Sequence, residues 1–232
     1  NENFNVYKNY NSKINYMYWT GGYDSTYNVC YSLIKENKIV QPIYFLYNLD
    51  NDSTKKLWVR RNRKQEFDAM DLVRSKIAEK FPHLEKNLLP TWFIKKDLPD
   101  KKFTQYFLKQ NLFPTKRKVH QYEHLSRFAY NTKIPIDIGV IGVHETSRFV
   151  AYLNKNLVEK DGVKLIPYEH PFKYLRFPLF GLTKEDMLEK AKENNFDDIL
   201  STSWSCWFPT KEGTPCGVCP MCRERIIDHP NL

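Results

Sequence analysis

The chain has 232 residues, enough for one sizeable α/β domain or for one domain with a small appendage, and its 41% hydrophobic and 27% charged residues are ordinary for a globular protein. No apolar run is long enough to span a bilayer and the polar beginning lacks the apolar stretch of a signal peptide, so we expect a cytoplasmic protein. The formal net charge of +9 fits either a solvated basic surface or attraction to nucleotides and nucleic acid. No nucleic-acid-binding motif accompanies the charge, so a stable nucleic-acid partner is not favoured.

Strand-like and helix-like segments alternate along the chain. Apolar segments predict strands at residues 15–19, 40–47, 92–94 and 136–143, the last of them typical of a central strand buried on both faces. Apolar residues at helical spacing predict helices after residue 22, around residues 67–77 and 125–129, and from Thr183, which with Asp186 has the spacing of a capping box. Residues 99–118 are expected to form a loop with one short helix, and residues 149–175 to be irregular, with a hairpin around Asp161 and Gly162. The alternation favours an α/β fold, a parallel sheet with helices on both faces.

A pair of glycines lies between the first predicted strand and an amphipathic helix. The segment reads Thr20-Gly21-Gly22-Tyr23-Asp24-Ser25-Thr26. Adjacent glycines let backbone N–H groups turn toward one anion, and the start of the helix adds its positive end. The hydroxyls of Thr20 and Ser25 can add donors, whereas Asp24 is expected to hold Mg²⁺ or to fix the loop. The Gly-Lys-Ser/Thr triplet of a Walker loop is absent, and a tight turn that caps the helix is the alternative.

This segment resembles the Ser-Gly-Gly-x-Asp-Ser signature of the PP-loop ATP pyrophosphatases, with Thr20 in place of the usual serine. The resemblance implies a Rossmann-like domain of the adenine nucleotide alpha hydrolase kind, which binds ATP and Mg²⁺ through residues 20–26. It also implies that Asp24 and Ser25 are catalytic, in a reaction that cleaves ATP between its α and β phosphates and passes AMP to an acceptor oxygen.

Four of the five cysteines crowd near the end of the chain, at Cys206, Cys216, Cys219 and Cys222. Two overlapping C-x-x-C steps with a fourth thiolate suit tetrahedral Zn²⁺, and a filled four-cysteine shell is typical of a structural site. A redox role and an iron–sulfur cluster are the alternatives. Arg223 and Arg225 beside the cluster are expected to face solvent, with contact to the thiolates as the alternative. We therefore expect an ATP-binding domain at residues 1–200 and a zinc-binding lobe, packed on it, at residues 201–232.

Three further segments extend the resemblance over most of the chain. The tail, Ser203-Trp204-Ser205-Cys206-Trp207 followed by Cys216-Gly217-Val218-Cys219-Pro220-Met221-Cys222-Arg223, resembles the zinc tail of the 7-cyano-7-deazaguanine synthase (QueC) family. Residues 140–145 and 177–184 resemble that family's Ile-Gly-Val-Asn-Glu and Pro-Leu-x-x-Leu-Thr-Lys segments. The resemblance implies an ATP-dependent ligase that adenylates 7-carboxy-7-deazaguanine, forms an amide with ammonia and then a nitrile, and is often a homodimer.

Two departures from the family's pattern leave the acceptor open. The family's Tyr-Gly-Gln-Arg-His stretch is replaced by a basic run in which Arg61 and Arg63 are candidates for phosphate contacts or members of a solvated helix face. The Tyr-Pro-Asp-Cys-Arg segment is absent, and His144 and Glu145 at the end of a predicted strand are candidates for substrate contacts or a hydrogen-bonded loop pair. A different carboxylate, amide or macromolecular acceptor, another PP-loop enzyme such as a thiolase or amidating ligase, and a non-catalytic binding module are the alternatives.

Overall fold

The computed structural model describes residues 11, 13–46, 61–94, 100–109, 112, 121–142, 148–167 and 171–228. The chain forms two compact units, each assembled from separate stretches of sequence. Unit 1 comprises Asn1–Tyr18 and Lys96–Thr183, and unit 2 comprises Trp19–Lys95 and Lys184–Leu232. None of the helices in the described part of the chain is long and apolar enough to cross a membrane.

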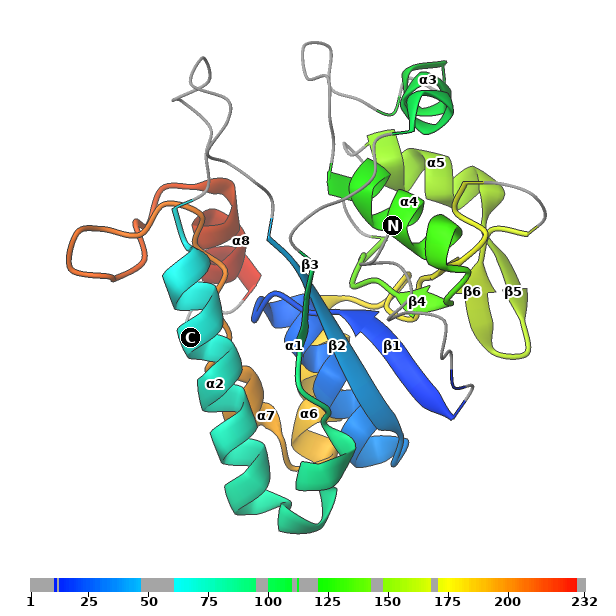
Figure 1. The fold of residues 1–232 in the computed structure, drawn as a ribbon. Coiled ribbons are helices and arrows are strands. Elements are labelled where there is room, and N and C mark those ends of the chain that lie inside the picture. Colours follow the sequence, from blue (N-terminus) through cyan, green and yellow to red (C-terminus); the bar gives the residue numbers. More distant parts are fainter. Residues whose placement is uncertain are drawn as a thin grey trace. The chain divides into compact units, whose positions relative to one another are not determined.

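Unit 1 is built on strands with two parallel and two antiparallel pairings. β1 (Ile14–Tyr18), β4 (Ile136–Asp137) and β7 (Leu175–Arg176) are parallel, and the antiparallel hairpin of β5 (Val158–Lys160) and β6 (Val163–Leu165) continues the sheet from β7. The helices of this unit are α3 (Lys101–Lys109), α4 (Gln121–Thr132) and α5 (Arg148–Asn156) (Figure 1). The predicted hairpin around Asp161 and Gly162 is confirmed, with both residues at positive φ in its turn.

Two predictions for unit 1 are wrong. The strand predicted over residues 136–143 is only two residues long, because the Val140 N–H donates to the carbonyl of Ile138 and closes the backbone on itself. The stretch predicted to be irregular contains α5, whose buried residues Phe149, Val150 and Leu153 follow helical spacing. The helical spacing of these apolar residues is visible in the sequence, and it indicates a helix where an irregular stretch is predicted.

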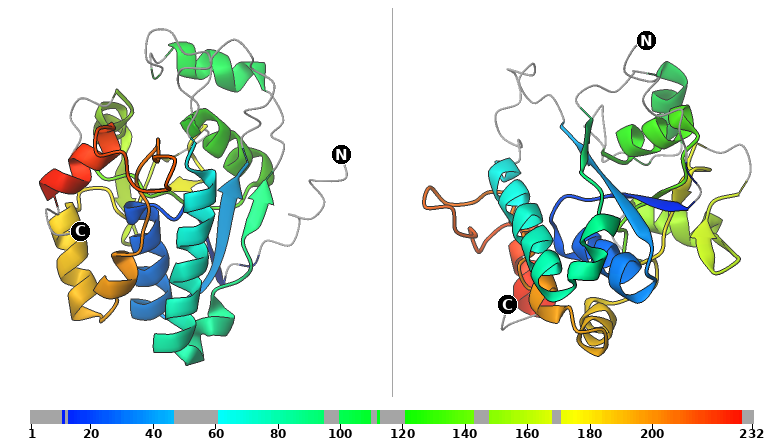
Figure 2. Two further views of the ribbon diagram at one scale, coloured as in Figure 1. Left: turned by 90° about the vertical axis from the view of Figure 1, so that its left-hand side faces the viewer. Right: turned by 60° about the horizontal axis from the view of Figure 1, so that its bottom comes forward.

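Unit 2 carries the glycine segment and the cysteines. It contains α1 (Tyr23–Cys30), a π-helical turn at Tyr31–Lys35, β2 (Ile39–Phe45), α2 (Arg63–Lys80), a 3₁₀ turn at Pro82–Asn87, β3 (Trp92–Ile94), α6 (Lys184–Glu193), α7 (Asp197–Leu200) and α8 (Pro220–Asp228). β2 and β3 are parallel, with Ile43 opposite Trp92. Helices α1, α2, α6 and α7 pack together, and the left view of Figure 2 shows α6, α1 and α2 side by side.

The core of unit 2 lies under α1 and α2. Tyr27, Cys30 and Leu33 are at most 1% exposed and form the buried face that the sequence predicts for the first helix. Val73 and Ile77 are also at most 1% exposed and belong to the buried face that the sequence predicts for α2. With parallel pairing dominant and helices between the strands along the chain, the predicted α/β class is confirmed.

Candidate functional site

The glycine segment forms a compact loop at the start of α1. Gly21 has a φ of 70°, a left-handed conformation that favours glycine, and Gly22 is extended and opens the helix without a side-chain cap. The N–H of Thr26 donates to the Gly22 carbonyl at 2.8 Å, the first bond of the helix. The first-turn N–H groups of a helix lack partners within it, so the start of α1 is suited to an anion.

The Ser25 side chain links two parts of this loop by hydrogen bonds. Its Oγ accepts a hydrogen bond from the Thr20 N–H at 3.3 Å and donates one to the Gly22 carbonyl at 3.2 Å. The Thr20 hydroxyl lies 3.5 Å from the Oγ of Ser25, and Thr20 itself is exposed. Behind the loop, the Trp19 indole N–H donates to the Thr26 hydroxyl at 3.1 Å. The structure thus brings Thr20, Ser25 and the two glycines together, whereas their roles toward ATP stay predictions.

Helix α2 supports the loop from one side. A Cβ on Gly21 would lie 2.7 Å from the carbonyl oxygen of Glu66, a distance at which atoms clash. The Glu66 carboxylate is buried and accepts hydrogen bonds from the Asn62 amide at 2.9 Å and from the Tyr44 hydroxyl. These bonds tie the first turn of α2 to β2, so the surface on which Gly21 rests is itself fixed.

The remaining predicted contacts are located only in part. Arg63 is the first residue of α2 and Arg61 precedes it, and both are exposed. The Arg61 N–H donates to the carbonyl of Trp207 at 3.0 Å, which joins the start of α2 to the cysteine segment. Contacts between these arginines and phosphate stay a prediction. His144 and Glu145 lie outside the residues that the structure describes.

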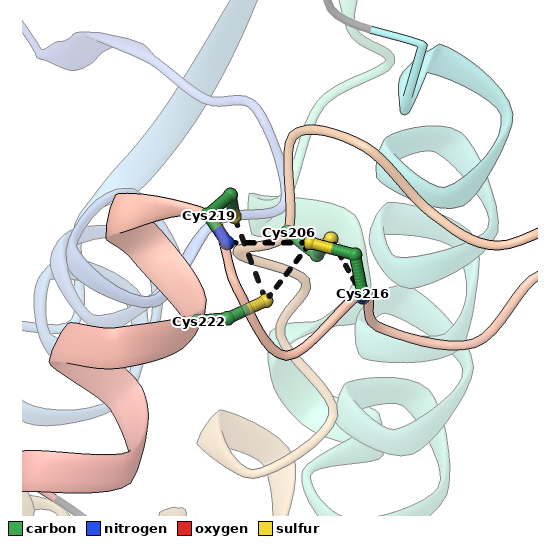
Figure 3. A group of neighbouring side chains, drawn as sticks. All are labelled: Cys206, Cys216, Cys219 and Cys222. Atoms are coloured by element: carbon green, nitrogen blue, oxygen red, sulfur yellow. Dashed lines mark hydrogen bonds between the residues drawn. The ribbon is translucent and has the colours of Figure 1, made fainter.

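The four clustered cysteines converge on one point. The sulfur atoms of Cys206, Cys216, Cys219 and Cys222 all lie within 4.8 Å of one another (Figure 3). The Cys219–Cys222 and Cys216–Cys222 sulfur pairs are 3.5 and 3.9 Å apart. Tetrahedral Zn²⁺ with Zn–S bonds of about 2.3 Å requires sulfur separations of about 3.8 Å. The donor set and its spacing therefore fit a four-thiolate metal site.

The surroundings shift the pKa values of three of these thiols in different directions. Burial raises the pKa of Cys206, and burial raises the pKa of Cys222 to about 12. The backbone N–H of Val218 is the largest influence on Cys216 and lowers its pKa to about 7. Because a bound divalent cation deprotonates coordinating thiols, metal binding would reverse the effect of burial.

The two arginines beside the cluster behave differently. Arg223 is exposed, as predicted. Arg225 contradicts the prediction, because its guanidinium donates to the carbonyl of Ser203 at 2.8 Å and to that of Ser201 at 3.1 Å. These partners are 22 and 24 residues away along the chain, so no local pattern could reveal them.

The segment between α7 and the cysteines reaches the glycine loop. The Trp204 N–H donates to the carbonyl of Gly21 at 2.8 Å, and the Trp204 indole donates to the carbonyl of Cys206 at 2.7 Å. A Cβ on Gly22 would lie 3.7 Å from the Trp204 carbonyl. The glycine loop and the cysteine cluster are therefore parts of one site in unit 2, joined through Trp204.

Comparison with known proteins bears on the second half of this site. The family model described as queuosine biosynthesis protein QueC matches residues 145–228. The 7-cyano-7-deazaguanine synthase of Prochlorococcus marinus subsp. pastoris is 41% identical over 70 residues, 30% of this chain and 27% of that protein. The 7-cyano-7-deazaguanine synthase 1 of Sphingopyxis alaskensis is 40% identical over 52 residues, 22% of each chain.

A third relative, the 7-cyano-7-deazaguanine synthase of Rhizorhabdus wittichii, is 42% identical over 48 residues, 21% of this chain and 20% of that protein. The matched stretches thus span about a fifth to a quarter of the curated relatives' length. The match to the QueC family model over residues 145–228, together with these three relatives, confirms the resemblance to that family drawn from the sequence.

Proposed function

We propose that the chain is an ATP-dependent ligase of the QueC kind, which transfers AMP from ATP to the oxygen of a carboxylate and lets ammonia displace that AMP. The observation that carries the proposal is the hydrogen bond between the Trp204 N–H and the Gly21 carbonyl. It joins the segment that matches the family, residues 145–228, to the glycine loop, which lies outside that match. A nucleotide on the loop would therefore lie beside residues of the family-matched tail.

The loop supplies groups suited to the triphosphate. The start of α1 presents N–H groups and the positive end of the helix to the phosphates, and the exposed Thr20 hydroxyl can add a donor. Asp24 lies in the first turn of α1 and is half-buried, so its carboxylate is suited to hold Mg²⁺ against the phosphates. A bound Mg²⁺ would offset the charge that develops on the phosphate oxygens as pyrophosphate leaves.

The proposed reaction consists of a nucleophilic substitution at phosphorus followed by one at the carbonyl carbon. A carboxylate oxygen of the acceptor attacks the α-phosphorus of ATP, and pyrophosphate leaves with the electrons of the broken P–O bond. Ammonia then attacks the activated carbonyl carbon, AMP leaves, and the amide nitrogen loses a proton. The loop acts in the first substitution by holding the phosphates in line and by excluding competing orientations.

The cysteine cluster has a structural part in this proposal. Zn²⁺ held by Cys206, Cys216, Cys219 and Cys222 would fill all four positions of its shell, which leaves none for a substrate. The acceptor that we propose first is 7-carboxy-7-deazaguanine, because the curated relatives are named 7-cyano-7-deazaguanine synthases. Another carboxylate or amide is the second candidate, since the family's segment after residue 145 is replaced in this sequence.

Incubation of the protein with ATP, Mg²⁺, ammonium and 7-carboxy-7-deazaguanine tests the proposal, with AMP and the base followed by mass spectrometry. We expect AMP together with an amide or nitrile of the base. Asp24→Ala is expected to lower AMP formation by roughly 100-fold or more, because a ligand that stabilises transition-state charge is lost. Asp68→Ala is the matched control, an exposed carboxylate of the same unit that pairs with Lys64.

The outcomes separate the parts of the proposal. AMP formation that requires ammonium but not this base would keep the ligase and change the acceptor. Unaltered AMP formation by a folded Asp24→Ala variant would remove the loop from the reaction. No nucleotide binding by the metal-loaded protein would overturn the proposed function.

A further inference from the structure

The residues between α7 and the cysteine cluster form a strap, defined here as residues 201–204, which is hydrogen-bonded to the glycine loop. The Trp204 N–H donates to the Gly21 carbonyl at 2.8 Å. The Cα of Gly21 also faces the Glu66 carbonyl of α2, so both α2 and the strap contact the loop at Gly21. Displacement of the strap therefore removes a support of the loop.

Arg225 holds the strap in place. Its two terminal nitrogens donate to the carbonyls of Ser203 and Ser201, at 2.8 and 3.1 Å. Two hydrogen bonds from one planar guanidinium to carbonyls two residues apart restrain both the position and the direction of the strap backbone. Burial lowers the pKa of Arg225, an effect that Tyr23 at the start of α1 and Cys222 oppose. The side chain thus joins α8 to the strap.

Two cysteines of the cluster lie near the two ends of this connection. Cys206 follows the strap by two residues, and its carbonyl accepts a hydrogen bond from the indole of Trp204 at 2.7 Å. Cys222 precedes Arg225 by three residues on α8. A metal ion bound by all four sulfurs would fix Cys206 relative to Cys222, and hence Trp204 relative to Arg225.

We propose that Arg225 is a positioning residue for the phosphate loop, through which metal binding by the cysteine cluster sets the geometry of the loop. The proposal rests on the proposed function in one respect, that a nucleotide binds at the loop. The path of contact runs from Cys222 to Arg225, to the carbonyls of the strap, and through the Trp204 N–H to Gly21. The cluster then has a second task beyond stabilising the fold.

Electrostatic attraction to a metal-bound cysteine cluster would also hold Arg225 in this position. Four thiolates around one divalent cation carry a net charge of about −2, so a half-buried guanidinium near Cys222 is favoured when metal is bound. Lysine keeps the charge but cannot donate to two carbonyls in a plane. Arg225→Lys therefore separates the two contributions, because it preserves the charge beside the cluster and removes the paired hydrogen bonds.

Hydrogen exchange followed by mass spectrometry tests the inference on the full chain loaded with zinc. Arg225→Lys is expected to speed exchange about tenfold in the peptides that cover residues 19–26 and 201–204, the factor expected for one lost hydrogen bond from a charged group. Zinc content should stay at one ion per chain, and ATP should bind about tenfold more weakly. Arg223→Lys, on the exposed face of the same helix, is the matched control and should change none of these.

A second measurement keeps the test decisive if Arg225→Lys loses its metal or its fold. Removal of zinc from the wild-type protein with a chelator should speed exchange in residues 19–26, and added zinc should restore it. Unchanged exchange in residues 19–26 after the substitution, or after verified loss of zinc, would overturn the inference. Wild-type protein that binds no ATP would instead overturn the proposed function, and the exchange rates would still decide the role of Arg225.

Discussion

Gly21 is the residue on which the loop depends most directly, because two separate constraints meet there. Its φ of 70° penalises any side chain, and a Cβ would clash with the Glu66 carbonyl at 2.7 Å. Gly162 offers a matched comparison, because its φ is 73° and a Cβ added there would meet no atom within 4 Å. The two positions therefore separate the conformational penalty from the steric one.

Gly21→Ala is predicted to destabilise the protein more than Gly162→Ala. The left-handed backbone alone costs about 1 kcal/mol for alanine, which we expect at residue 162. At residue 21 the contact with Glu66 adds roughly 1–3 kcal/mol of overpacking. Urea unfolding of both variants measures the difference, and ATP binding should weaken only in Gly21→Ala. Equal loss of stability in the two variants would mean that α2 yields and does not support the loop.

Single residues differ in how far the sequence reveals them. The two glycines and the four cysteines could be predicted, because their chemistry depends on spacing within a short segment. Tyr44, Glu66 and Arg225 could not, since their partners lie 22 residues or more away along the chain. Asn62 and Glu66 are four apart on α2, which indicates a contact between them but not their burial under the loop.

At the scale of elements, Asp198 joins α7 to α2. Its carboxylate lies 2.7 Å from the Lys80 ammonium and 3.8 Å from that of Lys76. Burial raises the pKa of Asp198, but the hydrogen bond from Lys80 and the charges of both lysines outweigh it, so the net shift is downward. A carboxyl group with a lowered pKa stabilises the fold while it is ionised.

Asp198→Asn is predicted to lower stability by about 0.5 kcal/mol near pH 7, a small effect because the side chain is 48% exposed. The difference from wild type should be complete above the ordinary aspartate pKa of about 3.9 and disappear as pH falls through the lowered pKa of the folded state. Urea unfolding at several pH values measures it. Asp68→Asn, in the more exposed pair with Lys64, should have a smaller effect, and a difference that grows on acidification would contradict the assignment.

The elements that could be predicted are those with enough apolar residues to establish a period. Helix α2 and strands β2 and β3 lie where the pattern placed them, and α6 begins one residue after Thr183. β4 could not be delimited from the sequence, since an apolar run does not show where its backbone turns away from the neighbouring strands. Helix α8 was not predicted, because its start at Pro220 lies among the cysteines and was interpreted as part of the metal-binding segment.

For the whole molecule, the arrangement of units is the feature that sequence order conceals. The boundary predicted after residue 200 stays a prediction, whereas the structure divides the chain after Tyr18, Lys95 and Thr183. Residues 201–228 share unit 2 with the glycine loop, so the cluster and the loop belong to one compact body. The hydrogen bond from the Trp204 N–H to the Gly21 carbonyl connects the two within that unit.

Removal of the metal is therefore predicted to act on unit 2 before unit 1. Cys219→Ser takes one thiolate from the cluster, and the remaining buried thiols then protonate because burial raises the pKa of Cys206 and Cys222. We expect a lower melting temperature and faster hydrogen exchange in residues 184–228. Hydrogen exchange in α4 and α5 of unit 1, which bury Phe128 and Phe149, should change little.

Cys30 provides the control, because it is a fully buried cysteine of unit 2 outside the cluster. Cys30→Ala should also lower the melting temperature, by the loss of a packed thiol, but its response to a chelator should match that of wild type. Cys219→Ser should show no further response, since its site is already incomplete. If the chelator lowers the melting temperature of Cys219→Ser as much as that of wild type, the metal binds elsewhere. If exchange rises equally in both units, they unfold as one cooperative body and the division has no energetic meaning.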